Sequence, residues 1–274
     1  MKKIVPFLAI PALAFASLNP DTAGPYTDSH GNTYNRLPQI SDFPDVASFD
    51  QAIGHEVFTT RDGHQFQIDR PLTQTELAQA LKDQVLARAG QAARGSGSTI
   101  AAVVTVNHPV DEEYRGIYGT TQALKNAVLA EVNTCDAALN SNFGIDFVSS
   151  SGQAWDSNDS ADIGSLLDEA FSEHGYRGKD MMIALSNDPT SGGAIGVGYI
   201  GLPRQLTKKY NGLEGEIMQH EAGHNYTLYH CDDSSCIMYP FLIAANLGNF
   251  HNYFESSPSG QNHYGTFNNQ RNRY

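Results

Sequence analysis

Four residues in one short stretch have the types and the spacing that chemistry at a metal ion requires. His220 and His224 are four residues apart, so on a helix they lie one above the other and can present two imidazole nitrogens to one Zn²⁺ ion. His230 follows after the predicted helix end, where the chain can turn back to supply a third ligand. Three histidine ligands leave a fourth position for water, which is typical of a catalytic zinc site.

Glu221 directly follows the first histidine and can lean over such an ion without binding it. In hydrolysis by a metal-activated water, a carboxylate in this position takes the proton of the water as general base and passes it to the leaving amine. The alternative interpretation, that the histidines are unrelated surface or core residues, is disfavoured by the regular spacing of all three. We therefore expect one zinc ion and hydrolysis of peptide bonds.

A helix must hold the histidine pair. Leu213 and Ile217 lead into it at helical spacing, so we predict a helix that ends at about Tyr226. The remaining histidines show no ligand spacing, and we expect them to be solvated or structural: His30, His55, His64, His108, His174, His251 and His263.

The stretch resembles the active site of the metzincin metallopeptidases, whose pattern HExxHxxGxxH is followed by a methionine turn. Met238 is the fitting methionine, and the resemblance implies that it lies beneath the zinc ligands as a hydrophobic floor. The resemblance also implies an α/β catalytic domain with a twisted mixed sheet, a long active-site helix and a zinc cleft. Residues 239–242 would form a wall of the primed-side specificity pocket, so Tyr239 is expected to contact the substrate.

Two departures from the family pattern stand out. The family glycine after the second histidine is Thr227 here, so either this residue is strained or the turn is made differently, with help from Asn225. The spacing of Cys231, Cys236 and the methionine is similar to that of archaemetzincins, which join these cysteines to a later CxxC around a second zinc. No cysteine follows Cys236, so we predict a Cys231–Cys236 disulfide and a single catalytic zinc. Cys135 falls on the apolar stripe of a helix, and we expect a buried free thiol there.

The first sixteen residues have the three parts of a signal peptide. Lys2 and Lys3 precede the apolar run 4–13, and the small-x-small sequence 14–16 predicts cleavage near Ala16. A membrane anchor is disfavoured because the run is too short to span a bilayer. Loss of the two lysines would take the formal charge from -13 to -15, which disfavours nucleic acid and anionic membranes as partners. We expect a secreted monomer, extracellular or periplasmic, that acts on a protein or peptide and does not insert stably into a membrane.

Residues 17–97 form a separate unit in the sequence. Thr73 and Glu76 predict a capped helix, which should end in the flexible composition of residues 90–98. We interpret residues 17–97 as a small α+β pro-segment and 98–274 as the catalytic domain, although an integral N-terminal subdomain that is never removed remains the alternative. Because the segment contains no cysteine, a cysteine switch is excluded, and an Asp, a His or steric coverage could maintain latency.

The catalytic part alternates between strands and helices. We predict strands at 100–106, 145–148 and 181–185, helices around 124–139 and 163–171, and a last helix within 260–273. This order indicates an α/β domain with a largely parallel sheet.

One further predicted strand, around residues 195–199, has only glycines on one of its two faces. Ile195, Val197 and Tyr199 alternate with glycine, which lets another backbone approach closely. The functional interpretation is an edge strand that pairs with an extended peptide substrate, with these three residues near it. The alternative is a bent or bulged strand.

Two rival functions remain at this stage. A zinc-binding adhesin or partner-binding module could keep the fold without turnover, but it would not need Glu221. A hydrolase of another amide, such as a peptidoglycan cross-link, is the second rival.

Overall fold

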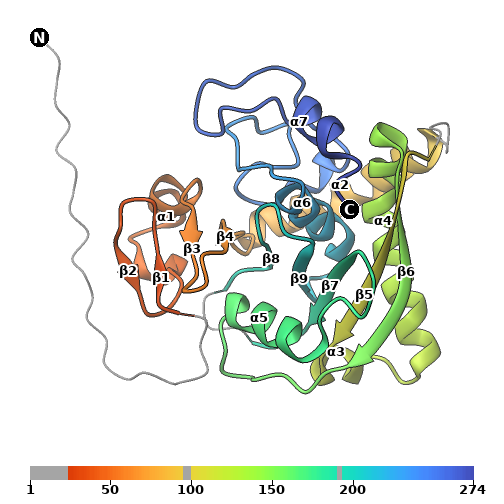
Figure 1. Ribbon diagram of the computed structural model, residues 1–274. Coiled ribbons are helices and arrows are strands. Elements are labelled where there is room, and N and C mark those ends of the chain that lie inside the picture. The colour runs from red at the N-terminus through yellow and green to blue at the C-terminus, as the bar shows by residue number, and fades with distance from the viewer. Residues whose placement is uncertain (1–23, 95–99, 190–192) are drawn as a thin grey trace, which may run out of the picture.

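The computed structural model describes residues 24–94, 100–189 and 193–274 (Figure 1). The predicted signal peptide and its cleavage site, and residues 95–98 of the predicted linker, lie outside the described residues.

A five-stranded sheet is the centre of the catalytic part. Its order is β6-β5-β7-β9-β8, and every neighbouring pair is parallel except β8 with β9, which is antiparallel. The strands are β5 (Ala102–Val110), β6 (Ile145–Ala154), β7 (Met181–Ser186), β8 (Gly196–Gly198) and β9 (Arg204–Lys208). The expected mixed sheet is confirmed, and β8 is its edge.

Helices cover both faces of this sheet (Figure 1). On one face α4 (Thr121–Phe143) and α6 (Glu214–Asn225) pack over a core that contains Met181, Ile183 and Leu185 of β7. On the other face α5 (Ile163–His174) packs over a second core that contains the alternate β7 residues. Successive side chains of a strand point to opposite faces of the sheet, so the fully apolar β7 contributes to both cores. Short helices complete this part: α3 (Glu112–Gly116), η2 (Ala244–Asn246) and α7 (His263–Gln270).

The N-terminal part contains a small antiparallel sheet in the order β2-β1-β3-β4. Its elements are β1 (Tyr26–Thr27), β2 (Thr33–Tyr34), η1 (Ile40–Asp42), α1 (Val46–Ile53), β3 (Phe58–Thr59) and β4 (Gln65–Phe66). Its aromatic residues Tyr26, Phe58 and Phe66 belong to the second core, together with the apolar face of α5. The Tyr26 hydroxyl also donates a hydrogen bond to Asp162 at 2.6 Å. Residues 24–68 therefore share a core with the catalytic part.

Helix α2 (Gln74–Arg94) follows this unit and contacts α4 and η2. The predicted capping box is present: Thr73 N donates to Glu76 Oε2 at 2.7 Å, and Glu76 N donates to Thr73 Oγ1 at 3.3 Å. The helix ends at Arg94, within residues 90–98 where we predicted its end. Val85 and Leu86, in the middle of the helix, are 68% and 73% exposed.

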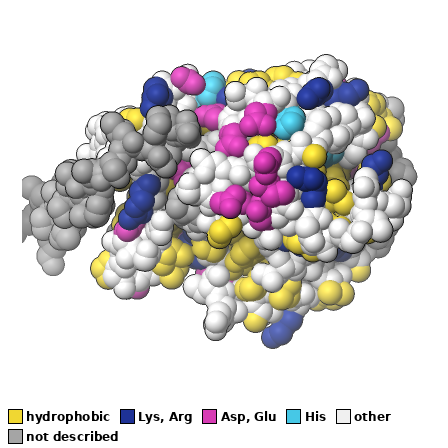
Figure 2. All heavy atoms as spheres, turned by 90° about the horizontal axis from the view of Figure 1, so that it is seen from below, with side chains coloured by type: hydrophobic (Ala, Val, Ile, Leu, Met, Phe, Trp, Pro, Cys, Tyr) yellow, Lys and Arg dark blue, Asp and Glu magenta, His cyan; other side chains and the backbone are white. Residues whose placement is uncertain are grey.

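Acidic side chains gather on the face that lies at the bottom in Figure 1, as Figure 2 shows. Helix α3 and nearby loops contribute close acidic groups, among them Glu112, Glu113 and Asp159. This surface agrees with the formal charge of -13. No helix within the described ranges has the length and apolar character needed to cross a bilayer.

Candidate metal centre

Helix α6 places His220, Glu221 and His224 in the interior, where each is at most 2% exposed. It ends at Asn225, one residue from the predicted end. Gly223 lies between the two histidines, and a Cβ there would be 3.0 Å from Cε of Met238. The methionine thus packs directly against the histidine-bearing turn of the helix, as the family resemblance implies.

The Nε2 atoms of the three histidines converge on one point. His230 Nε2 lies 3.1 Å from His220 Nε2 and 3.2 Å from His224 Nε2. Each Nδ1 faces a backbone carbonyl: His220 faces Ile237 O at 2.7 Å and His224 faces Leu228 O at 2.8 Å. A donor role for Nδ1 leaves Nε2 as the unprotonated nitrogen that a metal requires. The three nitrogens fit a zinc ion.

A fourth possible ligand comes from the N-terminal part. Asp69 Oδ1 lies 2.8 Å from His220 Nε2 and 3.2 Å from His230 Nε2. Asp69 is 4% exposed, and its carboxylate oxygens have no other hydrogen-bond partner among the described residues. A buried carboxylate is costly unless it is paired or coordinates a metal. Asp69 could therefore serve as a fourth ligand beside the three histidines.

The N-terminal part also supports His230 directly. His230 Nδ1 lies 2.6 Å from the carbonyl oxygen of Gly54, and His230 N donates to Gln67 Oε1 at 2.7 Å. The third histidine is therefore oriented by residues from a distant part of the sequence.

Glu221 lies beside this cluster, against the glycine face of β8. A Cβ on Gly198 would be 2.6 Å from the Glu221 carbonyl oxygen, and one on Gly196 would be 3.0 Å from Glu221 Cδ. Burial raises the pKa of Glu221 well above its usual range, and the neighbouring Asp69 carboxylate raises it further. The glycines thus admit the backbone of α6 and the Glu221 carboxylate.

Thr227 makes the turn between the second and third histidines, with a φ of 74°. It takes the left-handed conformation that the family glycine would take, so of the two predicted alternatives the strained one is correct. Leu228 N donates to Gly223 O at 2.9 Å, which closes the turn. Asn225 has another role, since its Nδ2 donates to Arg204 O at 3.0 Å.

The outer edge of β8 is paired with residues 65–69. Ile195 N donates to Asp69 O at 3.0 Å, Ile200 N donates to Gln65 O at 2.8 Å, and Asp69 forms an antiparallel bridge with Gly196. The extended segment thus lies where an added strand would lie.

The three side chains that we expected near a substrate are buried, at 3% exposure or less: Ile195, Val197 and Tyr199. Tyr199 packs against Phe66 in the second core. These side chains are therefore not available to an extended peptide in this state, and the backbone edge of β8 is occupied by residues 65–69. A substrate role for these residues stays a prediction.

Tyr239 borders a hollow of about 320 Å³. The hollow lies between residues 239–241 and the N-terminal residues Asp50, Gln51 and His55, with Asp232 at its margin. Arg70 stacks on Phe241, with its guanidinium carbon 4.2 Å from the ring centroid. The expected wall of the specificity pocket is therefore partly covered by the N-terminal part.

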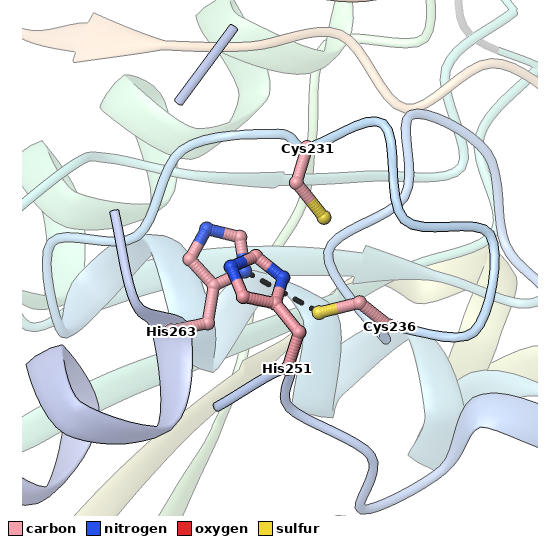
Figure 3. Close-up of side chains that lie close together, drawn as sticks. All are labelled: Cys231, Cys236, His251 and His263. Atoms are coloured by element: carbon pink, nitrogen blue, oxygen red, sulfur yellow. Dashed lines mark hydrogen bonds between the residues drawn. The ribbon is translucent and has the colours of Figure 1, made fainter. Parts of the chain in front are cut away.

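Cys231 and Cys236 are free thiols in the structure, which corrects the disulfide that we predicted. Their sulfur atoms face His251 and His263, two histidines to which we assigned no ligand role (Figure 3). Cys135 is also a free thiol and is fully buried, as expected.

The model of a family described as Reprolysin_5, metallo-peptidase family M12, matches residues 100–268. The chain belongs to this family. It is therefore a metzincin-type metallopeptidase, and the family implies zinc as the metal.

Other comparisons are distant. A solved structure titled "Structure of a chaperone-substrate complex" matches with 14% sequence identity and a TM-score of 0.47. The match covers 62% of this chain, which spans 34% of the length of that one. No curated protein matches.

Proposed function

We propose that this member of the M12 family is a secreted zinc endopeptidase, and that residues 24–94 belong to a latency-maintaining pro-segment. The observation that carries the proposal is the convergence of three histidine Nε2 atoms beside the buried Glu221. A zinc ion held by His220, His224 and His230 would polarise the scissile carbonyl and lower the pKa of a bound water. Glu221 would accept the water proton and donate it to the leaving amine.

The packing of residues 65–70 supports latency. Their backbone pairs with β8, the Asp69 carboxylate faces the histidines, and Arg70 covers Phe241. Edge-strand pairing is also a common way to bind an extended substrate. An incoming peptide would have to displace this segment, so Asp69 is the residue that we assign to the latency left open by the sequence.

Ion pairs hold the segment in place. Arg70 forms ion pairs with Asp50 and Glu76, and its side chain is 2% exposed. Arg88 of α2 pairs with Glu131 and with the fully buried Glu216, each at 2.9 Å. Together with the shared second core, these contacts mean that a single cut after Arg94 would not by itself detach residues 24–94.

The test uses the full chain with residues 95–98 replaced by the recognition sequence of a specific protease. Casein cleavage is measured before the cut, after the cut and after the cut with separation of the fragments, alongside Glu221→Gln. We expect little change after the cut alone and a rise once the fragments are separated, and we expect Glu221→Gln to lose about 100-fold or more in turnover while keeping its zinc. Zinc without casein cleavage at any stage would refute the endopeptidase proposal.

The role of Asp69 is tested in the uncut chain. Removal of a charge-assisted contact of this kind is worth about 1.5–3 kcal/mol, so Asp69→Ala should raise the residual activity of the uncut chain by about tenfold or more. Asp62→Ala is the matched control, because Asp62 is an exposed carboxylate of the same part. Equal activity of the two variants would remove Asp69 from the latency mechanism.

One observation favours a second candidate. Because Gly54 and Gln67 orient His230, the N-terminal part could be an integral component of a zinc-binding module without turnover. In that case the variant Glu221→Gln would leave its function unchanged, and separation of the cut fragments would release zinc without producing activity.

A further inference from the structure

A second cluster of four potential metal ligands lies outside the proposed catalytic centre. Cys231, Cys236, His251 and His263 are each at most 7% exposed. One ligand atom from each residue lies within 4.8 Å of the others. Figure 3 shows both sulfur atoms turned towards the two imidazole rings, which come from the C-terminal segment and from the first residue of α7.

The distances suit a tetrahedral zinc site. Zn–S bonds of about 2.3 Å and Zn–N bonds of about 2.0–2.1 Å place neighbouring sulfur and nitrogen ligands about 3.5 Å apart in a tetrahedron. Cys236 Sγ lies 3.3 Å from His263 Nδ1. The rings of His251 and His263 are stacked, with centroids 4.1 Å apart, so one ion could reach a nitrogen of each.

His251 provides an independent indication of a ligand. Its Nε2 lies 3.0 Å from the carbonyl oxygen of Gln261 and therefore carries the ring proton. Its Nδ1 is buried and has no hydrogen-bond partner within the part of the chain that the structure describes. In a metal-binding histidine, one ring nitrogen commonly donates to a carbonyl oxygen and the other binds the metal. The buried Nδ1 of His251, beside two thiols and without a partner, fits the metal-binding role.

We propose that Cys231, Cys236, His251 and His263 bind a structural zinc ion. Two cysteines and two histidines are a standard closed ligand set for zinc, and thiolate ligands disfavour magnesium or calcium. The four protein ligands leave no open position, so this zinc would not be catalytic. The chain would then hold two zinc ions, where the sequence alone led us to expect one.

The position of the site gives it a role. Cys231 directly follows the catalytic ligand His230, and its N–H donates to Met238 O at 3.0 Å. The zinc would tie this loop to the C-terminal segment, where Tyr264 N donates to His251 O at 3.0 Å. It would thus hold His230 and the methionine turn in place.

The test measures metal in the intact full-length chain. We expect about two zinc ions per chain in the wild type and about one in His220→Ala/His224→Ala, which lacks the catalytic pair. When cobalt(II) replaces zinc, thiolate-to-cobalt charge-transfer absorption should appear in both proteins, because only the second site contains thiols. Cys231→Ser and His251→Ala should each lose this absorption and one zinc.

Matched controls are Cys135→Ser, which removes the thiol outside the cluster, and His174→Ala, which removes a histidine outside both sites. Both should retain two zinc ions. If the cluster variants fail to fold, the wild type still decides the question. Its two thiols should resist a thiol reagent until a chelator removes zinc. One zinc without thiolate absorption, or a Cys231–Cys236 disulfide in a peptide map of the exported protein, would overturn the proposal.

Discussion

Replacement of Thr227 by glycine should stabilise the protein, although the residue lies between His224 and His230, two of the proposed zinc ligands. Thr227 has a φ of 74°, and a residue with a Cβ loses roughly 1–2 kcal/mol in the left-handed region. Glycine removes this strain but adds about 0.5–1 kcal/mol of backbone entropy to the unfolded chain. The side chain is partly exposed and near Gly201, so few contacts are lost. We expect a net gain of about 1 kcal/mol, or about 2–4 °C in Tm for a domain of this size.

Denaturant and thermal unfolding of Thr227→Gly and wild type, at one fixed free zinc concentration, measure this gain without a difference in metal linkage. Thr227→Ala is the control, because alanine keeps the Cβ and loses only the hydroxyl and methyl groups. We expect the alanine variant to be no more stable than the wild type. If alanine and glycine gave the same change, the strain at φ 74° would not be the cause, and our reasoning about this turn would be refuted.

Two further predictions concern the glycine strand and acid stability. Gly198→Ala would place a Cβ 2.6 Å from the Glu221 carbonyl oxygen, so we expect a loss of about 1–3 kcal/mol in unfolding free energy. The fractional loss of peptidase activity should exceed the fractional loss of bound zinc. Unchanged stability would mean that α6 does not contact β8 this closely. Burial lowers the pKa of His108 from 6.5 to about 4, and its neutral ring is held by Ile183 O and Ser149 Oγ at 3.1 and 3.0 Å. Because the folded pKa is depressed, this group should cost stability as pH falls below about 6.5, with the loss levelling off below about 4 at up to about 3 kcal/mol. Titration of unfolding free energy in His108→Gln should remove that part of the acid sensitivity, and an identical pH profile would contradict the assignment.

Local periodicity predicted most of the catalytic part. The stripe through Val128, Val132 and Cys135 is buried on α4, and the apolar run at 181–185 is the central strand β7. These predictions succeed because helix and strand periods are properties of neighbouring residues. The same holds for the approach to the histidines, where spacing alone predicted the helix to within one residue.

Long-range contacts could not be predicted in this way. Asp69 reaches the histidines because residues 65–69 pair with β8, and no local pattern marks one aspartate of the N-terminal part over another. Eleven residues separate His251 from His263, well beyond the three to five intervening residues that indicate a histidine pair in a zinc finger. The α7 cap at Asn262 and the loop before it bring them together, so the second ligand set is visible only after folding.

The glycines of β8 show how one pattern can have two physical causes. One of the two interpretations that the sequence left open was close approach of a substrate backbone. The open glycine face instead receives α6 and Glu221, and residues 65–69 pair along the strand edge. A strand offers its edge to a neighbour through backbone groups, whatever its side chains are. Glycines on one face of a strand therefore indicate that something packs closely over that face. Whether the strand lies at the edge of the sheet has to be inferred from the topology.

The two proposals meet at His230. In the structure its ring is oriented by Gly54 O and its N–H is bonded to Gln67. Displacement of the N-terminal part would remove both contacts. His230, which lies outside α6, would then lose its orientation. The adjacent Cys231 gives the loop a second attachment that does not depend on residues 24–94, through the cluster with His251 and His263. A structural zinc at this place would let the pro-segment leave without disordering the third catalytic ligand.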